Sequence, residues 1–148
     1  MSTVSLSFSP LPAEVRTARL LAVVLARRSG LPDELLDEVR LAVGEVCSRA
    51  VAVHARLHSA EHVEVAMTDD DRGYEITVRD VGDAGAVVSA DLEDFVADAD
   101  ADGARDLTGQ LPALPAGLDL AVVGGLVDDV TVSAGASGGT VVRLRWQR

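Results

Sequence analysis

The sequence predicts an α+β fold, a two-layer α/β sandwich in which three helices cover one face of a mostly antiparallel sheet. Two observations lead to this prediction. Apolar residues recur every three or four positions in two long stretches of the first third of the chain, as they do in amphipathic helices. Shorter stretches on either side of these alternate apolar with polar residues and are bounded by turn-forming residues, as half-buried strands are.

The first predicted strand covers residues 4–8, and two prolines after it end the strand. A helix over residues 13–29 follows and ends at Gly30. A second helix opens at Pro32, because proline suits the first helical turn and the acids after it face the positive end of the helix dipole. Its apolar stripe consists of Leu35, Val39, Val43, Val46, Ala50, Val53 and Leu57.

Residues 63–67 and 74–78 are predicted to pair as a hairpin, since turn-forming residues fill the interval from Asp69 to Gly73. Residues 83–116 hold eight acidic residues against one arginine. A segment of this length without regular structure is usually functional or disordered, and we expect a solvated, mobile acidic loop here. The last predicted elements are a third helix across 118–128 and a hairpin of strands at 130–132 and 142–146.

Length and composition predict one domain spanning residues 1–148. The net charge of −11 argues against binding to DNA or RNA phosphates and favours a protein partner with a basic surface, or a small ligand in a local pocket. Arg27 and Arg28 interrupt the most apolar stretch before it reaches the roughly 18 residues that a membrane span needs, and no secretory signal is visible. The single cysteine, Cys47, fits a reducing compartment, so we expect a cytoplasmic protein.

Chemistry-bearing side chains concentrate on the second helix. Glu45 and Arg49 are four residues apart, so they share a helix face at the edge of the apolar stripe and are expected to form an ion pair. Cys47 lies beside the stripe and is expected to be a small buried residue rather than a nucleophile. The spacing of His54, His58 and His62 is compatible with zinc, but no cysteine or second histidine pair joins them, so no metal site is predicted.

Four motifs occur along the chain in a fixed order: GEVCSRAV (44–51), VRDVGDAG (78–85), GLDLAVVGGLVDDVTV (117–132) and GGTVVRL (138–144). In this order and on these elements, they resemble the RsbW/SpoIIAB-like anti-sigma-factor serine kinases of the GHKL (Bergerat) ATPase superfamily. The resemblance covers nearly the whole chain except the acidic segment. It implies an ATP-binding sandwich of the type predicted above.

The resemblance also implies roles for single residues of the second helix. In the resembled family this helix reads Glu-x-x-x-Asn-Ala, where the glutamate is the general base of phosphoryl transfer and the asparagine oxygen helps to hold Mg²⁺. Glu45 and Ala50 match this motif, but Arg49 stands at the asparagine position. Guanidinium has five donors and no acceptor, so it cannot bind a metal ion. It would either replace the metal charge beside a phosphate or pair with Glu45, and we expect the pair.

The remaining motif positions are divided between the two halves of the implied nucleotide pocket. Asp80 and Gly82 match an Asp-x-Gly motif that recognises adenine, and Thr140 matches a threonine on the same side of the site. Gly117 and Asp119 fall on a Gly-x-Gly-Leu motif whose backbone approaches the phosphates, but the second glycine is replaced by aspartate. A carboxylate about 5 Å from a phosphate charge costs about 3 kcal/mol at an effective dielectric of about 20. The phosphate and metal half of the pocket is therefore predicted to be damaged.

These residues favour a regulatory binding protein that has weak or lost ATP binding and no cofactor. The resemblance implies that such a protein sequesters a sigma factor and is controlled by an anti-anti-sigma protein of the STAS type. Homodimers are common in the resembled family, and exposed sheet edges allow one here. The alternative is an active ATP- and Mg²⁺-dependent serine kinase that phosphorylates the STAS partner with Glu45 as base. Arg49 and Asp119 count against this alternative.

Overall fold

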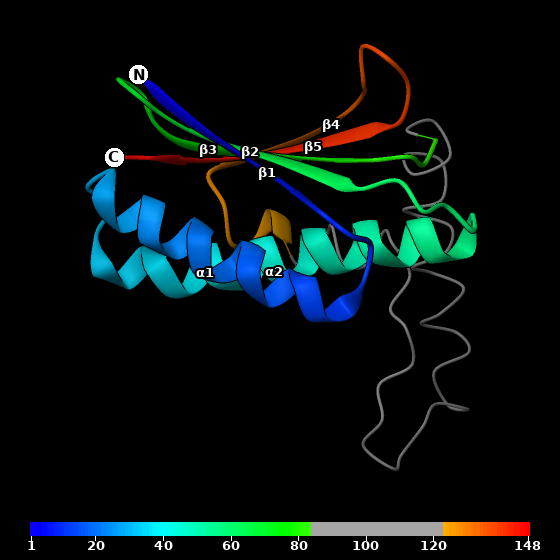
Figure 1. Cartoon of the computed structure of the whole chain (residues 1–148). Helices are drawn as coiled ribbons and strands as arrows, with labels where there is room; N and C mark the ends of the chain where they lie inside the picture. The colour runs from blue at the N-terminus through cyan, green and yellow to red at the C-terminus, as the bar shows by residue number, and fades with distance from the viewer. Residues whose placement is uncertain (84–122) are drawn as a thin grey trace, which may run out of the picture.

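A computed structural model of the chain describes residues 1–83 and 123–148. The described residues form one five-stranded sheet in the order β1-β2-β3-β5-β4, in which every neighbouring pair is antiparallel. Two helices, α1 and α2, follow β1 and pack on one face of the sheet (Figure 1). The elements are β1 (Ser2–Phe8), α1 (Pro12–Arg28), α2 (Asp33–Arg56), β2 (Val63–Asp70), β3 (Gly73–Asp80), β4 (Asp129–Ala134) and β5 (Thr140–Gln147). The predicted fold class is confirmed.

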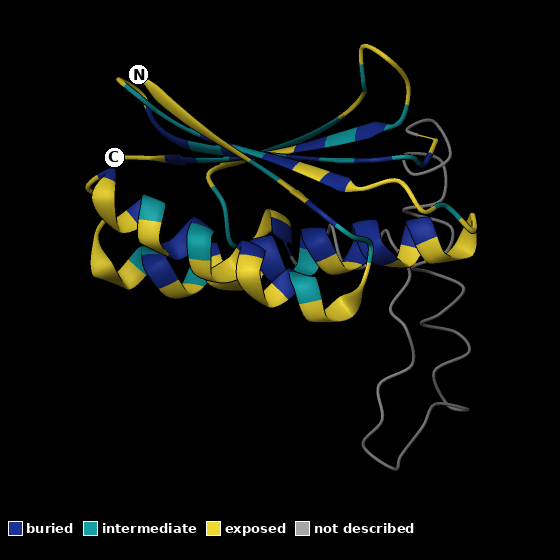
Figure 2. Cartoon of the chain, viewed as in Figure 1, coloured by how far each residue is buried: buried dark blue, intermediate teal, exposed yellow. Residues whose placement is uncertain are grey.

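The core lies between the helices and the inner face of the sheet. One row of cross-strand partners on that face is apolar over all five strands: Val4, Met67, Ile76, Leu144 and Val130. The three central members of the row are at most 2% exposed, whereas Val4 on the edge strand is 38% exposed. The sheet is therefore well covered at its centre and less well covered at β1 (Figure 2).

The helix α2 is the most buried helix among the described residues. Its predicted apolar stripe is confirmed at Val39, Val43, Val46, Ala50 and Val53. Both ends of the stripe differ from the prediction, because Leu35 is only partly buried and Leu57, which caps the helix, is 51% exposed.

The hairpin of β2 and β3 is tighter than predicted. Both strands run further than expected, so the turn consists of Asp71 and Arg72 rather than of residues 69–73. Asp70 Oδ1 accepts hydrogen bonds from the backbone N–H of Arg72 (2.8 Å) and of Gly73 (3.2 Å). Gly73 has φ +148°, and a Cβ there would lie 2.1 Å from the carbonyl oxygen of Trp146. Only glycine fits this close approach between β3 and β5.

The predicted third helix and acidic loop lie mostly outside the described residues. Within the described part, Val123 and Gly124 are helical, and the chain then turns before β4 begins at Asp129. The predicted helix end at residue 128 is therefore wrong. Two consecutive glycines favour an earlier end, and the indole N–H of Trp146 donates to the carbonyl of Leu126 at 3.0 Å, which ties the turn to β5. None of the helices in the part of the chain that the structure describes is long and apolar enough to span a bilayer.

Candidate functional site

A buried ion pair joins the two layers of the sandwich. Arg49, in the second half of α2, donates from Nη1 to Oδ2 of Asp80, the last residue of β3, at 2.8 Å. The side chains are only 2% and 1% exposed. A charge pair so far from solvent is screened little, and it is stable only because the two charges compensate each other. Each residue therefore depends on the other for its place in the core.

This pair corrects the prediction that Arg49 would pair with Glu45. Glu45 is one turn earlier on α2 and only partly buried, and the structure places no ion pair between the two residues. An exposed pair along a helix contributes about 0.3–0.5 kcal/mol, because water screens it and two long side chains must be ordered. Arg49 instead turns into the core, where the fixed carboxylate of Asp80 compensates its charge.

The other carboxylate oxygen of Asp80 also accepts a hydrogen bond. This oxygen, Oδ1, accepts the backbone N–H of Gly82 at 2.6 Å. The carbonyl of Gly82 accepts the hydroxyl proton of Thr140, the first residue of β5, at 2.8 Å. A Cβ on Gly82 would lie 2.9 Å from both Asp80 Oδ1 and Val53 Cγ1, so glycine allows this turn to close over the carboxylate. The structure thus brings together Arg49, Asp80, Gly82 and Thr140 as one hydrogen-bonded group.

The residues at the start of β5 also lie close to Asp80, as those of the turn at Gly82 do. Gly139 has φ +81°, and a Cβ there would lie 2.2 Å from the backbone oxygen of Asp80. Glycine is needed both for the left-handed conformation and for the contact. Thr140 is fully buried and is the cross-strand partner of Asp80. The second half of α2, the end of β3 and the start of β5 therefore converge on the ion pair.

His54, on α2, is hydrogen-bonded to the turn that follows β3. Its ring is fully buried, Nδ1 lies 2.9 Å from the carbonyl oxygen of Glu61, and Nε2 lies 3.1 Å from the backbone nitrogen of Val81. Since the backbone N–H of Val81 donates, Nε2 is the acceptor and Nδ1 carries the proton. Both ring nitrogens are used in holding the chain between α2 and the segment after β3.

The other two histidines lie elsewhere. The Nδ1 atom of His62 is 3.0 Å from the hydroxyl of Ser7, and His58 follows the end of α2 with φ +54°. Across residues 1–83 and 123–148, no three His, Cys, Asp or Glu side chains gather in a way that could hold a metal ion. The helical spacing of the histidines thus reflects structural hydrogen bonds in at least two of the three.

Arg49 uses only part of its hydrogen-bonding capacity. Its Nε and Nη2 atoms are buried and have no hydrogen-bond partner within the part of the chain that the structure describes. A buried donor without a partner costs about 1–3 kcal/mol, and more when it is charged. The compensation of the guanidinium thus rests on the single contact with Asp80, so we expect this contact to be sensitive to substitution.

Cys47 lies on α2 and is fully buried, which confirms the predicted burial of this residue. Burial raises the pKa of its thiol to about 12, although the positive charge of Arg19 acts in the opposite direction. The thiolate is the nucleophilic form of cysteine, so this thiol is unreactive in the folded protein.

Two of the predicted site residues, Gly117 and Asp119, lie outside the described residues. Two features of the site were not predicted from the sequence, namely the Arg49–Asp80 pair and the hydrogen bonds of His54. A signal for both was present, because Arg49 is three residues after Val46 and His54 is four after Ala50. Both residues therefore continue the spacing of the buried stripe, which predicts burial even for a polar side chain.

A family model of the histidine kinase-like ATPase domain matches residues 8–146 of the chain. The match covers both helices, the strands β2, β3 and β4, and β5 except for its last residue, whereas only Phe8 of β1 lies within it. The chain therefore belongs to the histidine kinase-like ATPase domain family. No curated protein matches the chain.

Proposed function

We propose that the chain is a regulatory binding protein of the anti-sigma-factor type, in which the Arg49–Asp80 ion pair has closed the nucleotide site of the family. The buried contact of 2.8 Å between these residues is the observation that carries the proposal. It joins the position at which the resembled kinases bind Mg²⁺ to the carboxylate with which they recognise adenine.

The metal side of the site does not fit Mg²⁺. This ion takes oxygen ligands in a nearly octahedral arrangement, and guanidinium offers only N–H donors. The positive charge of Arg49 would also repel a cation, and it lies in a region that is 2% exposed, where water screens little. Of the residues that the resemblance assigns to catalysis, Glu45 remains as a general base without a metal site beside it.

The carboxylate to which the resemblance assigns adenine recognition already has hydrogen-bond partners within the protein. The two carboxylate oxygens of Asp80 already accept from Arg49 and from the backbone of Gly82. The side chain is 1% exposed, so the amino group of a base would have to displace the guanidinium to reach it. That displacement would leave the charge of Arg49 buried without a partner, which is strongly unfavourable.

Loss of the metal site argues against kinase activity in particular. Phosphoryl transfer depends on metal ions that neutralise the developing charge and on precise positioning of the phosphates. A protein that keeps the sandwich but lacks the metal ligand retains surfaces for protein partners. The net charge of −11 supports a basic partner, such as the DNA-facing region of a sigma factor, because opposite charges raise the association rate.

A pull-down from the native cell tests the partner assignment. We expect it to recover a sigma factor, a STAS-domain protein, or both, and recovery of neither would contradict the proposal. A second assay follows transfer of labelled phosphate from ATP to a serine of the STAS partner. We expect no transfer, and transfer that Glu45→Gln abolishes would establish the kinase instead.

A further inference from the structure

The free edge of β1 is unusually open to another strand. Among residues 1–83 and 123–148, the sheet order places β1 and β4 at the two edges, where one row of backbone N–H and C=O groups has no strand partner. Proteins usually protect such edges with charged residues or proline. β4 begins with Asp129, whereas the seven residues of β1, STVSLSF, contain neither a charge nor a proline. The edge of β1 can therefore accept a further strand.

Apolar side chains lie next to this edge. On α1, Arg19 lies against Gly44 of α2, so the opposite side of α1 faces away from α2. That side carries Leu21 and Leu25, which are partly buried, and Val24, which is 49% exposed. Together with Val4 and Leu6 of β1, Leu21 and Leu25 form what we call the β1-edge surface. A contiguous apolar surface beside an unpaired strand is typical of an interaction site.

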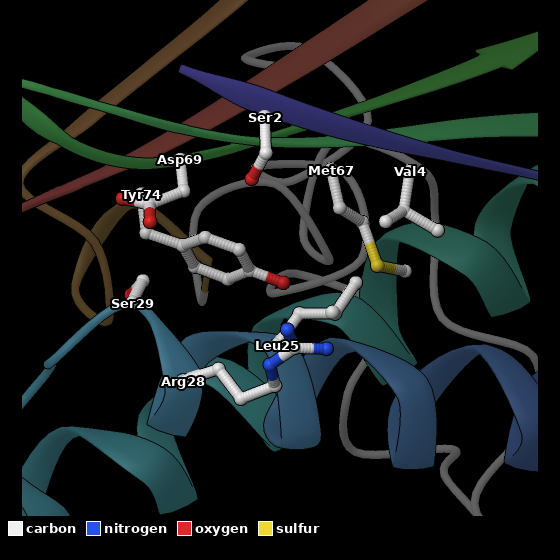
Figure 3. A pocket seen from close by; sticks show the side chains of 8 residues that line it. All are labelled: Ser2, Val4, Leu25, Arg28, Ser29, Met67, Asp69 and Tyr74. Atoms are coloured by element: carbon white, nitrogen blue, oxygen red, sulfur yellow. The ribbon is translucent and has the colours of Figure 1, made fainter.

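A cavity of about 220 Å³ opens at this surface, between β1 and the C-terminal end of α1 (Figure 3). Val4, Leu25, Met67 and Tyr74 supply its apolar lining. Pockets for small-molecule ligands usually measure about 300–1,000 Å³. This cavity is smaller and lies beside a free strand edge, which suits a single side chain of an added strand better than a separate ligand.

The charges at the cavity select the kind of side chain. Arg28 lines the cavity from the helix side, opposite Asp69 on β2 (Figure 3). Asp69 is paired with Arg148 at 3.3 Å. The guanidinium of Arg28 has no ion-pair or hydrogen-bond partner among residues 1–83 and 123–148. The cavity therefore offers one uncompensated positive charge, although the chain as a whole is strongly acidic.

We propose that the β1-edge surface docks an extended segment of a partner protein, which adds a strand to β1 and places a carboxylate side chain in the cavity against Arg28. In strand addition the backbone hydrogen bonds supply affinity, and a pocket for alternate side chains supplies specificity. The aliphatic residues that flank the carboxylate face Val4 and Leu6. This site lies at the end of the sandwich opposite the C-terminal end of β3, and the inference does not depend on the proposed function.

Selection of displayed random peptides on the full chain tests the proposal. We expect enriched peptides that are β-branched and apolar, with one Asp or Glu at a fixed position. The variant Arg28→Glu should weaken binding of these peptides by about tenfold or more and should select Lys or Arg at the same position. Arg27→Glu is the matched control, because it makes the same charge change at the neighbouring position, does not line the cavity, and should leave the selected sequence unchanged.

Amide hydrogen exchange locates the bound peptide. Binding should slow exchange at alternate residues of β1, where N–H groups point to the free edge, and should leave β4 unchanged. Three results would overturn the proposal: no enrichment over the bare support, the same selected sequence with Arg28→Glu as with the unaltered chain, or protection that leaves out β1.

Discussion

Arg49 and Asp80 form a 2.8 Å ion pair between α2 and the end of β3, with both side chains almost completely buried. In a histidine kinase-like ATPase domain, this contact lies where the resemblance places the metal and the adenine. A single substitution on the helix thus has two effects in our account. It replaces the asparagine to which the resemblance assigns a metal ligand, and it supplies a cation that pairs with the carboxylate to which the resemblance assigns base recognition.

The first prediction concerns the free energy of unfolding. We expect Arg49→Met and Asp80→Asn each to lower it by about 3–5 kcal/mol, because each leaves a buried group of the pair without its partner. The double variant should lose less than the sum of the two single losses, by about 0.5–3 kcal/mol. Urea unfolding of the four proteins measures this cycle.

The matched control for this cycle is the exposed pair of Arg40 and Asp37, whose side chains are 53% and 90% exposed at 3.4 Å. Arg40→Met should change the free energy of unfolding by less than about 1 kcal/mol. Additive losses for Arg49 and Asp80, or losses no larger than this control, would mean that the buried pair does not exist.

The second prediction concerns the turn after β3. Gly82→Ala should lower the free energy of unfolding by about 1–3 kcal/mol, because the added Cβ would lie 2.9 Å from both Asp80 Oδ1 and Val53 Cγ1. Gly124→Ala is the control, since within the described part of the chain the atom closest to an added Cβ is Val130 Cγ1, at 4.0 Å. The melting temperatures of the two variants, measured by thermal unfolding, test this difference. Equal melting temperatures would show that the turn does not pack against Asp80.

The third prediction concerns acid stability. Hydrogen bonds from the backbone N–H of Arg72, and then from Arg145, hold the pKa of Asp70 below its ordinary value of 3.8. A lowered carboxyl pKa stabilises the fold at pH values above the unfolded pKa, and this contribution is lost as the pH falls through the folded pKa. Asp70→Asn should therefore make the loss of stability below about pH 4 less steep.

Urea midpoints between about pH 2.5 and pH 6 measure this dependence. Asp71→Asn, at the exposed neighbouring position, should leave the slope as it is in the unaltered chain. If the stability of Asp70→Asn depends on acid pH in the same way as that of the unaltered chain, the hydrogen bonds of the Asp70 carboxylate do not stabilise the fold.

The fourth prediction concerns Cys47. Because the thiol is fully buried and its pKa is raised to about 12, a chromogenic disulfide reagent at pH 8 should react with it only as fast as the protein opens. In urea the same thiol should react at once and in full. Rapid reaction of the native protein would contradict the packing of α2 against the sheet.

Much of the fold could be predicted from the sequence because the patterns are local. Alternation at Val63, Val65 and Met67 places these side chains on one face of β2 wherever that strand lies in the sheet. The predicted end of the third helix was wrong because the indole of Trp146, 20 residues further along the chain, donates a hydrogen bond to the carbonyl of Leu126 and fixes the turn there.

The site was harder to predict, because its central contact joins residues 31 positions apart. The helical spacing of Glu45 and Arg49 suggested a local pair, and the spacing alone could not show that Arg49 faces the end of β3. The single roles of Asp80, Gly82 and Thr140 stay predictions that rest on the resemblance. Their position in one hydrogen-bonded group is what the structure adds.

Calorimetric titration with ATP and ADP, with and without Mg²⁺, tests the closed nucleotide site most directly. The variant Arg49→Asn with Asp119→Gly serves as the positive control, since it restores the two residue types that the resemblance assigns to the metal and the phosphates, and it releases Asp80. We predict no binding in the micromolar range for the unaltered chain under any of these conditions, and measurable Mg²⁺-dependent ATP binding for the double variant. Micromolar or tighter binding of Mg²⁺–ATP by the unaltered chain would contradict the account.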